Sequence, residues 1–504
     1  MNVLLIGSHV RGSFFGGSHC NNLGLLSIAS NLDPEHKVKV FDCFKKGETV
    51  NVKQIIDDFR PRVIGLSAMT FQYEGARNFA AEIRKRYRDI IIVLGGYHAT
   101  AMYKETMKSG DGKLFDYVIR KEGEYAFNKL LQAIDGRCQF DEVPNLSYVR
   151  DGVPVHTESY ESVNLDEIKL PDRRLIADND YSSYVVILGT TDFVTCVETS
   201  RGCIHNCDFC SIKLMYTTPY RTYSLSRVIE DIKNIKQFQP QTKRIFFVDD
   251  NITADPKRFE ELCDLIIENK LNTFKFSTQG SSVGLSSSET LVTKMKEAGF
   301  DFVFIGIENN SKTNLKYMGK GNILSRTETA CKYLRKHGIK IVGALIFGWP
   351  DDDKESIKSA FKYLRKLGAH YPAAQFYTPF PKTVLREDYL KRKLIDNIDD
   401  YIYYDLGFCN IHTNHLSSRE LYKTAVVEYL KHFLFLQRKG FIETLDLRTV
   451  FQKFTKLLKL HFLIYLVIYG PGDKIGNDLI KRKSDARKKS EASRFFEKPA
   501  GASC

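Results

Sequence analysis

The sequence predicts an α/β protein with two successive series of strands and helices, followed by a helical carboxy-terminal region. Short apolar runs alternate with amphipathic stretches over residues 1–135, and a second alternation occupies residues 191–400. After residue 400 the alternation stops and stretches of helical period replace it. With 504 residues, the chain is long enough for two or three domains, each with its own core.

The first series, residues 1–135, predicts a doubly wound parallel sheet of flavodoxin-like size, because each apolar run is followed by a helix that carries the chain back across the sheet. Ligands of such sheets bind beyond the carboxyl ends of the strands, where segments 65–70, 95–100 and 120–124 lie. The expected strands are 2–6, 37–41, 62–67, 90–94 and 116–119, and the expected helices are 23–31, 53–59, 74–87 and 124–134.

The second series begins after a connector, residues 136–190, which contains three prolines and is predicted to form a small hairpin around Asp151-Gly152. Beyond it, six apolar runs are separated by amphipathic stretches long enough for helices. The expected strands are 192–198, 244–248, 274–278, 302–307, 340–347 and 374–377, and the expected helices are 226–238, 256–267, 288–298, 325–337 and 355–367.

The carboxy-terminal region divides at residue 472. Residues 401–472 predict a helical domain, with one long helix at 418–438. Residues 450–459 alternate Phe and Leu with Lys and lead into an apolar run at 460–469, which is about half the length that spans a membrane. This stretch fits a helix packed on the rest of the protein, or an interfacial helix at the inner face of the membrane. Residues 473–504 are basic and predict a disordered tail.

Charge and cysteine usage restrict the environment of the protein. Lys and Arg exceed Asp and Glu by 74 to 61, and the resulting basic surface attracts nucleic acid, anionic lipid or acidic partners without choosing among them. The 11 cysteines are odd in number and show no paired framework, which indicates a reducing cytoplasm. The first apolar run has no basic flank or cleavage site, so no secretory signal is expected.

Cys203, Cys207 and Cys210 form a C-x3-C-x2-C array, which is the most informative segment of the chain. Three thiolates at this spacing can hold three irons of a cubane cluster and leave the fourth iron open to another ligand. A zinc site would need a fourth Cys or His at short spacing, and His205 lies too near its neighbours in the loop to complete a tetrahedron easily. The array therefore favours a [4Fe-4S] cluster over zinc.

This spacing, with the aromatic Phe209 directly before the third cysteine, resembles the signature of the radical S-adenosylmethionine (SAM) superfamily. The resemblance implies a partial (β/α)6 barrel over residues 191–400, with Cys203, Cys207 and Cys210 as metal ligands and catalytic centre. It also implies that the reduced cluster cleaves SAM to a 5′-deoxyadenosyl radical, which removes hydrogen from an unactivated carbon. An electron donor such as flavodoxin or ferredoxin would reduce the cluster.

The resemblance also assigns SAM contacts to the carboxyl ends of the barrel strands. Asp249 and Asp250 follow the second strand, where the family usually holds the methionyl amine, and an anionic pair favours an ammonium group. Ser277 and Gln279 stand where relatives often carry a Ser-x-Arg pattern that reaches the carboxylate. Because Gln replaces Arg here, that contact would be a neutral hydrogen bond.

Two further strand ends complete the expected SAM site. Glu308 ends a G-x-E pattern after the fourth strand and is expected to accept hydrogen bonds from the ribose or amino group of SAM. Gly348 follows the fifth strand in a turn whose backbone is expected to face adenine, and Phe209 of the cysteine loop is expected beside the same cofactor. Segment 376–381, after the sixth strand, is placed near the substrate entrance.

The loops of the first series resemble the cobalamin-binding domain that precedes many radical SAM barrels. Glycines in these loops let the backbone approach a flat corrin, and hydroxyl groups can bond its nucleotide tail. The loop at 7–12 lacks the Asp that would orient a cobalt-binding imidazole, so His9 is not expected to bind cobalt. The expected cobalamin contacts are Leu23, Ser67, Met69, Thr70, Gly95, Gly96, His98, Glu122, Gly123 and Glu124.

Together the two resemblances imply a cobalamin-dependent radical SAM enzyme that methylates, joins or rearranges an unactivated carbon of a small molecule or lipid, hopanoids and isoprenoids among them. One alternative keeps the cluster but omits cobalamin, as in a tetrapyrrole cyclase or a natural-product oxidase. A second alternative, from another class, is an RNA-binding or RNA-modifying protein attracted through the basic tail. The sequence shows no RNA-binding module or single-strand stacking pattern, so nucleic acid is not an expected partner.

Overall fold

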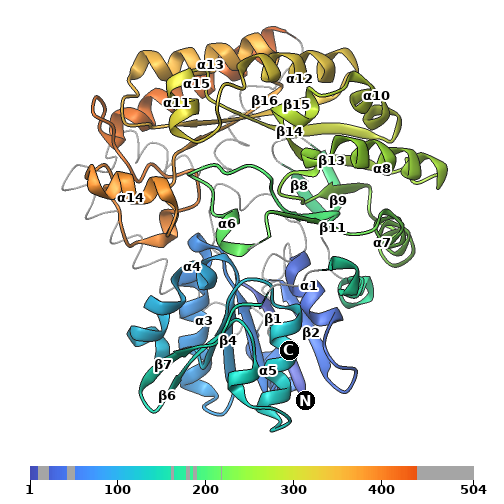
Figure 1. Ribbon diagram of the computed structural model, residues 1–504, viewed down its shortest axis with the longest axis vertical. Helices are drawn as coiled ribbons and strands as arrows, with labels where there is room; N and C mark the ends of the chain where they lie inside the picture. The colour runs from blue at the N-terminus through green and yellow to red at the C-terminus, as the bar shows by residue number, and fades with distance from the viewer. Residues whose placement is uncertain are drawn as a thin grey trace, which may run out of the picture.

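The computed structural model describes residues 1–8, 22–42, 52–160, 164–177, 182–185, 190–216 and 218–439. Two α/β units lie one above the other along the long axis, the first coloured blue to cyan and the second green to orange (Figure 1). The predicted doubly wound sheet and partial barrel, with a helix at the end of the described chain, are confirmed. His9, the segment 450–469 and the predicted tail lie outside the described residues.

The first unit is built on a seven-stranded sheet in the order β2-β1-β3-β4-β5-β6-β7. Strands β1 to β5 are parallel, and the side chains of Val3 to Ile6 on the inner strand β1 are at most 1% exposed, as expected for a sheet covered on both faces. The strands are β1 (Asn2–Gly7), β2 (Lys37–Asp42), β3 (Val63–Ser67), β4 (Ile91–Gly95), β5 (Tyr117–Ile119), β6 (Leu146–Arg150) and β7 (Val153–His156).

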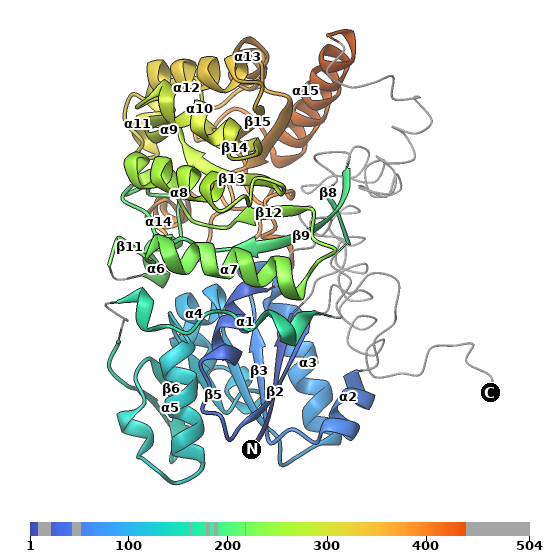
Figure 2. The same ribbon diagram turned by 90° about the vertical axis from the view of Figure 1, so that its right-hand side faces the viewer.

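Helices cover both faces of this sheet. Apolar side chains of α1 and α5 pack on one face and those of α2, α3 and α4 on the other, and Figure 2 shows α2 and α3 on the opposite side from α5. The helices are α1 (Leu23–Ser30), α2 (Val52–Phe59), α3 (Tyr73–Arg86), α4 (Tyr97–Lys108) and α5 (Glu124–Ile134). This arrangement leaves the carboxyl ends of the parallel strands facing the second unit.

Two features of the first unit differ from the sequence prediction. Helix α4 was not predicted, and the expected loop at 95–100 ends at Gly96, whose φ of +98° turns the chain into the helix. The hairpin at Asp151-Gly152 forms as predicted, but its strands join the sheet antiparallel beside β5. The sheet therefore extends into the stretch predicted as a connector.

The second unit is a curved, open sheet in the order β16-β15-β14-β13-β12-β9-β8. Strands β9 and β12 to β16 are parallel, and β8 pairs antiparallel at one edge. The strands are β8 (Ser182–Val185), β9 (Thr190–Val197), β12 (Arg244–Phe247), β13 (Lys275–Ser281), β14 (Phe300–Glu308), β15 (Lys340–Phe347) and β16 (Tyr371–Phe376). A separate two-stranded ribbon pairs β10 (Ser200–Gly202) with β11 (Tyr220–Thr222).

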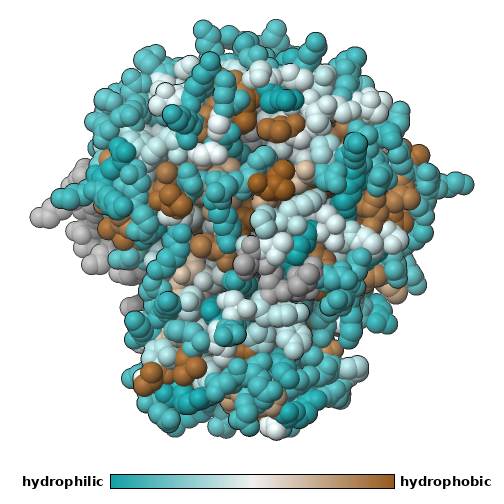
Figure 3. Space-filling view, in the orientation of Figure 1, coloured by the Kyte–Doolittle hydropathy of each residue, from teal (hydrophilic) through white to brown (hydrophobic). Residues whose placement is uncertain are grey.

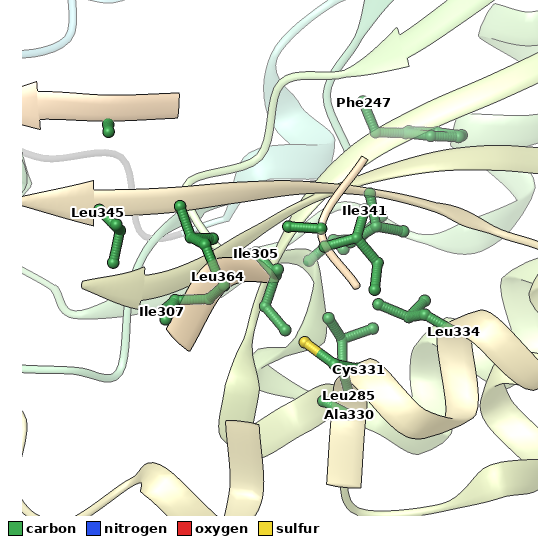
Figure 4. Close-up of a cluster of buried hydrophobic side chains, with 14 of the residues drawn as sticks. Phe247, Leu285, Ile305, Ile307, Ala330, Cys331, Leu334, Ile341, Leu345 and Leu364 are labelled. Carbon is green, nitrogen blue, oxygen red and sulfur yellow. The ribbon is translucent and has the colours of Figure 1, made fainter. Parts of the chain in front are cut away.

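The helices of the second unit bury one apolar face each against the sheet. Figure 4 shows this core, where Ile305 and Leu345 of the strands meet Cys331 and Leu364 of the helices. The longer helices are α7 (Leu225–Phe238), α8 (Pro256–Glu268), α10 (Glu289–Glu297), α12 (Leu324–Lys336) and α13 (Lys354–Leu367). The short ones are α6 (Ile212–Met215), α9 (Ser282–Leu285), α11 (Lys312–Tyr317) and α14 (Val384–Lys391).

The last described helix, α15 (Ser418–Arg438), has the predicted bounds and packs against α13. Its Tyr429 hydroxyl donates to the Ala374 carbonyl, which fixes the helix to the edge of the barrel. Among the described residues, no helix is long and apolar enough to cross a membrane. One face of the molecule is mostly hydrophilic, with apolar side chains in small separate groups, an ordinary pattern for a protein surface (Figure 3).

Candidate active site at the junction of the two units

The cysteine loop is closed at its base by the β10–β11 ribbon. Gly202, directly before Cys203, has a φ of +83°, and a Cβ there would lie 2.3 Å from the Pro219 carbonyl oxygen. Only glycine fits this close approach between the two arms of the ribbon. Cys207 is buried, and Cys203 and Cys210 are half-buried. The fold therefore brings the three predicted ligands into one short, tightly closed loop.

The number of ligands in the loop separates the two metal hypotheses. A structural zinc site takes four protein ligands, whereas a cubane held by three thiolates binds each of them on a different iron and leaves the fourth iron open. The three cysteines of this loop therefore suit a [4Fe-4S] cluster.

Burial also affects the protonation of the thiols. It raises the pKa of Cys210 to about 12 and raises the pKa of Cys207 as well, because an apolar environment disfavours the thiolate. Without iron, these two side chains are neutral thiols at physiological pH. Iron must therefore displace their protons when it binds.

The two aspartates after β12 support the cysteine loop. Asp249 accepts hydrogen bonds from the Thr199 backbone at 3.2 Å and from the Thr199 hydroxyl at 2.7 Å, and Asp250 accepts from the Gly202 backbone at 3.0 Å. Desolvation raises the pKa of Asp249 to about 6 and that of Asp250 to about 7. Both carboxylates lie next to the cysteine loop, and the oxygens of Asp249 bond the segment that leads into it.

On β13, the third strand of the barrel, Gln279 stands where the family pattern often has Arg, and its side chain makes a contact within the protein. Gln279 Nε2 donates to the Asp249 carbonyl oxygen at 2.7 Å, so this side chain links β13 to the loop after β12. Ser277, two residues earlier on β13, is buried. Gln279 therefore holds the aspartate loop in place, a role that the sequence pattern did not suggest.

Glu308 lies at the end of β14 with a φ of +64°, and its Oε1 is 2.9 Å from Lys320 Nζ. Lys320 also lies 6.0 Å from the centre of the Phe209 ring. The Asp208 backbone donates to the Met318 carbonyl at 3.1 Å, which joins the Lys320 turn to the cysteine loop. Sequence reasoning missed Lys320, because a single lysine between two glycines forms no recognisable pattern.

Gly348 occupies a tight turn after β15. Its φ is +94°, and a Cβ there would lie 2.7 Å from Ile411 Cδ1. Its N–H donates to Asp352 at 2.9 Å, and its carbonyl accepts from the Tyr389 hydroxyl at 2.8 Å. Both backbone groups therefore have partners inside the protein, so a contact with adenine would use the neighbouring backbone or the open face of the turn.

A cavity of about 330 Å³ lies between the carboxyl ends of the first sheet and the cysteine-bearing side of the barrel. Eight of the ten predicted cobalamin contacts line it: Leu23, Ser67, Met69, Gly95, Gly96, Glu122, Gly123 and Glu124. The barrel contributes Glu198, Arg201, Met215, Tyr216 and Tyr223, none of which was predicted. A site bounded by glycines, apolar side chains and a few polar groups suits a large, flat cofactor such as cobalamin.

The other two predicted contacts do not line this cavity. Thr70 is buried in a short turn before α3. His98 is 1% exposed and stacks on Tyr73 with ring centres 3.9 Å apart, while Tyr401 meets its edge at 4.9 Å. His98 therefore belongs to the packing between α3, α4 and the chain after the barrel.

Arg201, on β10, connects the barrel to the first unit. Its guanidinium lies 2.7 Å from Glu122, 2.7 Å from Glu124 and 2.9 Å from Glu198. Arg221, on β11, lies 2.7 Å from the other oxygen of Glu122. The charge cluster holds the pKa of Arg201 well above its usual value, since three carboxylates surround it. No local sequence pattern links residues so far apart in the chain.

Comparison with known proteins agrees with this geometry. The B12 binding domain model matches residues 16–131, and the Radical SAM superfamily model matches residues 197–364. An uncharacterized methyltransferase of Pyrococcus horikoshii is 31% identical over 376 residues, which are 74% of this chain and 79% of the relative. The hopanoid C-3 methylase of Methylococcus capsulatus is 28% identical over 421 residues, 81% of this chain and 76% of that one.

The fold is also shared with a solved structure. The radical SAM methyltransferase TsrM from Kitasatospora setae, with cobalamin and a [4Fe-4S] cluster bound, aligns with a TM-score of 0.63 at 17% identity, covering 78% of this chain and 75% of that one. The chain belongs to the radical SAM superfamily, among the members that carry a cobalamin-binding domain before the barrel. It is an enzyme of methyltransferase or cyclase type that uses a [4Fe-4S] cluster, SAM and cobalamin.

Proposed function

We propose that this protein is a cobalamin-dependent radical SAM methyltransferase that methylates an unactivated carbon of a hydrophobic small molecule, of the lipid or isoprenoid class. The observation that carries the proposal is the cavity at the carboxyl ends of the first sheet, whose opposite wall includes Arg201, two residues before the first cysteine of the cluster loop. A methyl carrier and a radical source would then share one site. The similarity to a hopanoid methylase over most of both chains supports the lipid class.

In this proposal, the residues of the site have separate tasks. When bound, the cluster and SAM supply a 5′-deoxyadenosyl radical, and cobalamin supplies the methyl group. Cys203, Cys207 and Cys210 hold the cluster, while the glycines at 95 and 96 let the backbone approach the corrin. Tyr216 lines the cavity on the barrel side, and burial raises its pKa well above the usual value, so its hydroxyl stays neutral.

The remaining SAM contacts are assigned by position. Asp250 is proposed to receive the methionyl amine, because its carboxylate lies against the root of the cysteine loop. Glu308, Ser277 and Phe209 are proposed to bound the nucleoside, with the turn at Gly348 beside adenine. We also propose that a flavodoxin or ferredoxin reduces the cluster, since radical generation consumes one electron from outside the protein.

The cofactor content of the protein is the first experiment. Protein is purified without oxygen from cells supplied with cobalamin, and its iron, sulfide, zinc and cobalt are measured. About four irons and one cobalt per chain are expected. Zinc in place of iron would overturn the proposal, and iron without cobalt would favour the cobalamin-free cyclase or oxidase.

The second experiment tests the reaction and the substrate class. The loaded enzyme, a reductant and SAM with a deuterated methyl group are incubated with lipid extracts of the host cells, and the products are examined by mass spectrometry. A lipid that gains the deuterated methyl group, together with 5′-deoxyadenosine, is expected. The Cys203→Ala variant should form neither product. Label found only in polar metabolites would overturn the lipid assignment and keep the methyltransferase.

A further inference from the structure

We infer that Arg201 is a positioning residue that couples the cobalamin site to the cluster site. Arg201 is 6% exposed and stands two residues before Cys203. Its side chain lies against the loop of the first unit that lines the cavity. One residue therefore touches the structural supports of both cofactors. This inference rests on the cofactor assignment of the proposed function.

The contacts of Arg201 use every nitrogen of the guanidinium. Nη1 bonds Glu122, Nη2 bonds Glu124, and Nε bonds Glu198, the residue directly after β9. A planar fork with three acceptors has one orientation only, which a lysine ammonium cannot reproduce. The position of the loop at 122–124 is therefore fixed relative to the strand that leads into the cysteine loop.

The loop at 122–124 is also fixed by a contact within the first unit. Glu122 and Glu124 flank Gly123, which lines the cavity between them. The Ser27 hydroxyl on α1 donates to Glu124 at 2.7 Å, and α1 contributes several residues to the same cavity wall. Cobalamin bound in the cavity would contact the loop that carries Glu122 and Glu124, the two partners of Arg201 in the first unit.

On the barrel side, a shift of the Arg201 side chain would be passed to the cysteine loop, because Arg201 stands only two residues before Cys203. Both arms of the ribbon take part, because Arg221 on β11 bonds Glu122 at 2.7 Å. The Gly202 backbone is bonded to Asp250, so the ribbon has little freedom to absorb a shift elsewhere. Because these charges are buried, losing one partner leaves an uncompensated charge rather than a solvated one. The cluster loop and the cobalamin loop are therefore expected to order each other.

Reciprocal ordering predicts a measurable coupling. The dissociation constant of hydroxocobalamin is measured on the full-length protein with the cluster reconstituted and with the cluster removed. In the wild type, the cluster is expected to tighten cobalamin binding by about fivefold or more. In Glu124→Gln, which removes one carboxylate from the fork, the ratio of the two constants is expected to fall to near one. Arg201→Lys should give an intermediate ratio.

The ratio separates coupling from a direct loss of binding, because weaker cobalamin contacts alone would raise both constants equally. Arg244→Met is the matched control. Arg244 is 1% exposed and bonds Asp301 at 2.9 Å, but both residues lie within the barrel unit at the other end of its strands. This variant should lose stability and keep the wild-type ratio.

Several outcomes would overturn the inference. A wild-type ratio near one would show no coupling, and an unchanged ratio in both Glu124→Gln and Arg201→Lys would show that Arg201 does not carry it. A ratio that falls equally in Arg244→Met would assign the effect to general stability. If the wild type bound no cobalamin at all, the proposed function would be overturned as well. Cobalamin binding without coupling would overturn only the role of Arg201, so the two failures can be told apart.

Discussion

Lys320 Nζ lies 2.9 Å from Glu308 Oε1 and faces the ring of Phe209, at 6.0 Å from its centre. Glu308 is the predicted SAM contact at the end of β14, and Phe209 immediately precedes the third cysteine. The Lys320 side chain is 16% exposed, and a cation so shielded from water beside a cluster with three thiolate ligands stabilises the reduced, more negative state of that cluster. The Lys320–Glu308 ion pair therefore links the predicted SAM site to the reduction potential of the cluster, on which radical generation depends.

The first prediction is that Lys320→Met lowers the reduction potential of the cluster. The expected shift is on the order of 60 mV, which is tenfold in the equilibrium for a one-electron couple. The potential is measured by an EPR-monitored redox titration of the reconstituted protein. Lys320→Arg keeps the charge and should stay near the wild type. Lys294→Met removes a comparable ion pair on the surface, with Asp264, and should have no effect. An unchanged potential in Lys320→Met would contradict the prediction.

The second prediction concerns the root of the cysteine loop. Gly202→Ala places a Cβ 2.3 Å from the Pro219 carbonyl at a φ of +83°, so the ribbon must open. We expect the iron content after reconstitution to fall to less than half, with a lower unfolding temperature.

Gly136→Ala is the matched control for this change. Its φ is +75°, but a Cβ there meets nothing within 4 Å. This variant carries only the cost of the left-handed backbone, about 1–2 kcal/mol, and should retain full iron. Equal iron in the two variants would show that the close approach at Gly202 does not shape the cluster site.

The elements of the fold follow well from the sequence, because burial on both faces of a parallel strand leaves a continuous apolar run. Helix α15 has the predicted bounds for a similar reason, since its period persists over many turns. Helix α4 was missed because it follows two glycines and its φ and ψ angles depart from helical values at Met102. Eight of the ten predicted cobalamin contacts line one cavity. Arg201 and Lys320 could not be found, because a single basic residue forms no pattern, and the partners of Arg201 in the first unit depend on how the two units dock.

The third prediction tests the metal ligands. Cys203→Ala should reduce iron and sulfide to background and abolish the cluster absorption, because two thiolates do not hold a cubane in water. Iron, sulfide and the EPR spectrum of the reduced protein are measured without oxygen. Cys263→Ala is the control, since Cys263 is fully buried in the barrel core and should affect stability alone. A Cys203→Ala protein with four irons and a normal spectrum would contradict the assignment.

The fourth prediction concerns His98, which lies between the rings of Tyr73 and Tyr401. Desolvation lowers its pKa from 6.5 to about 3, because the imidazolium would have no water and no acidic partner in this packing. The neutral ring is therefore favoured in the folded state. The stability it contributes is fully present above pH 6.5 and is lost as pH falls from 6.5 toward 3, by up to about 1.4 kcal/mol per pH unit.

Histidine-labelled protein allows a direct measurement of this shift by NMR. The His98 resonance is identified by its absence in His98→Phe, a change that keeps an aromatic ring against Tyr73. Its chemical shift should stay constant between pH 8 and pH 5, while exposed histidines titrate. The same substitution should also reduce the loss of unfolding free energy between pH 6.5 and pH 5, because one proton fewer is taken up on unfolding. A His98 titration midpoint near 6.5 would show instead that the ring is hydrated in solution, and that the packing between α3, α4 and the chain after the barrel opens there.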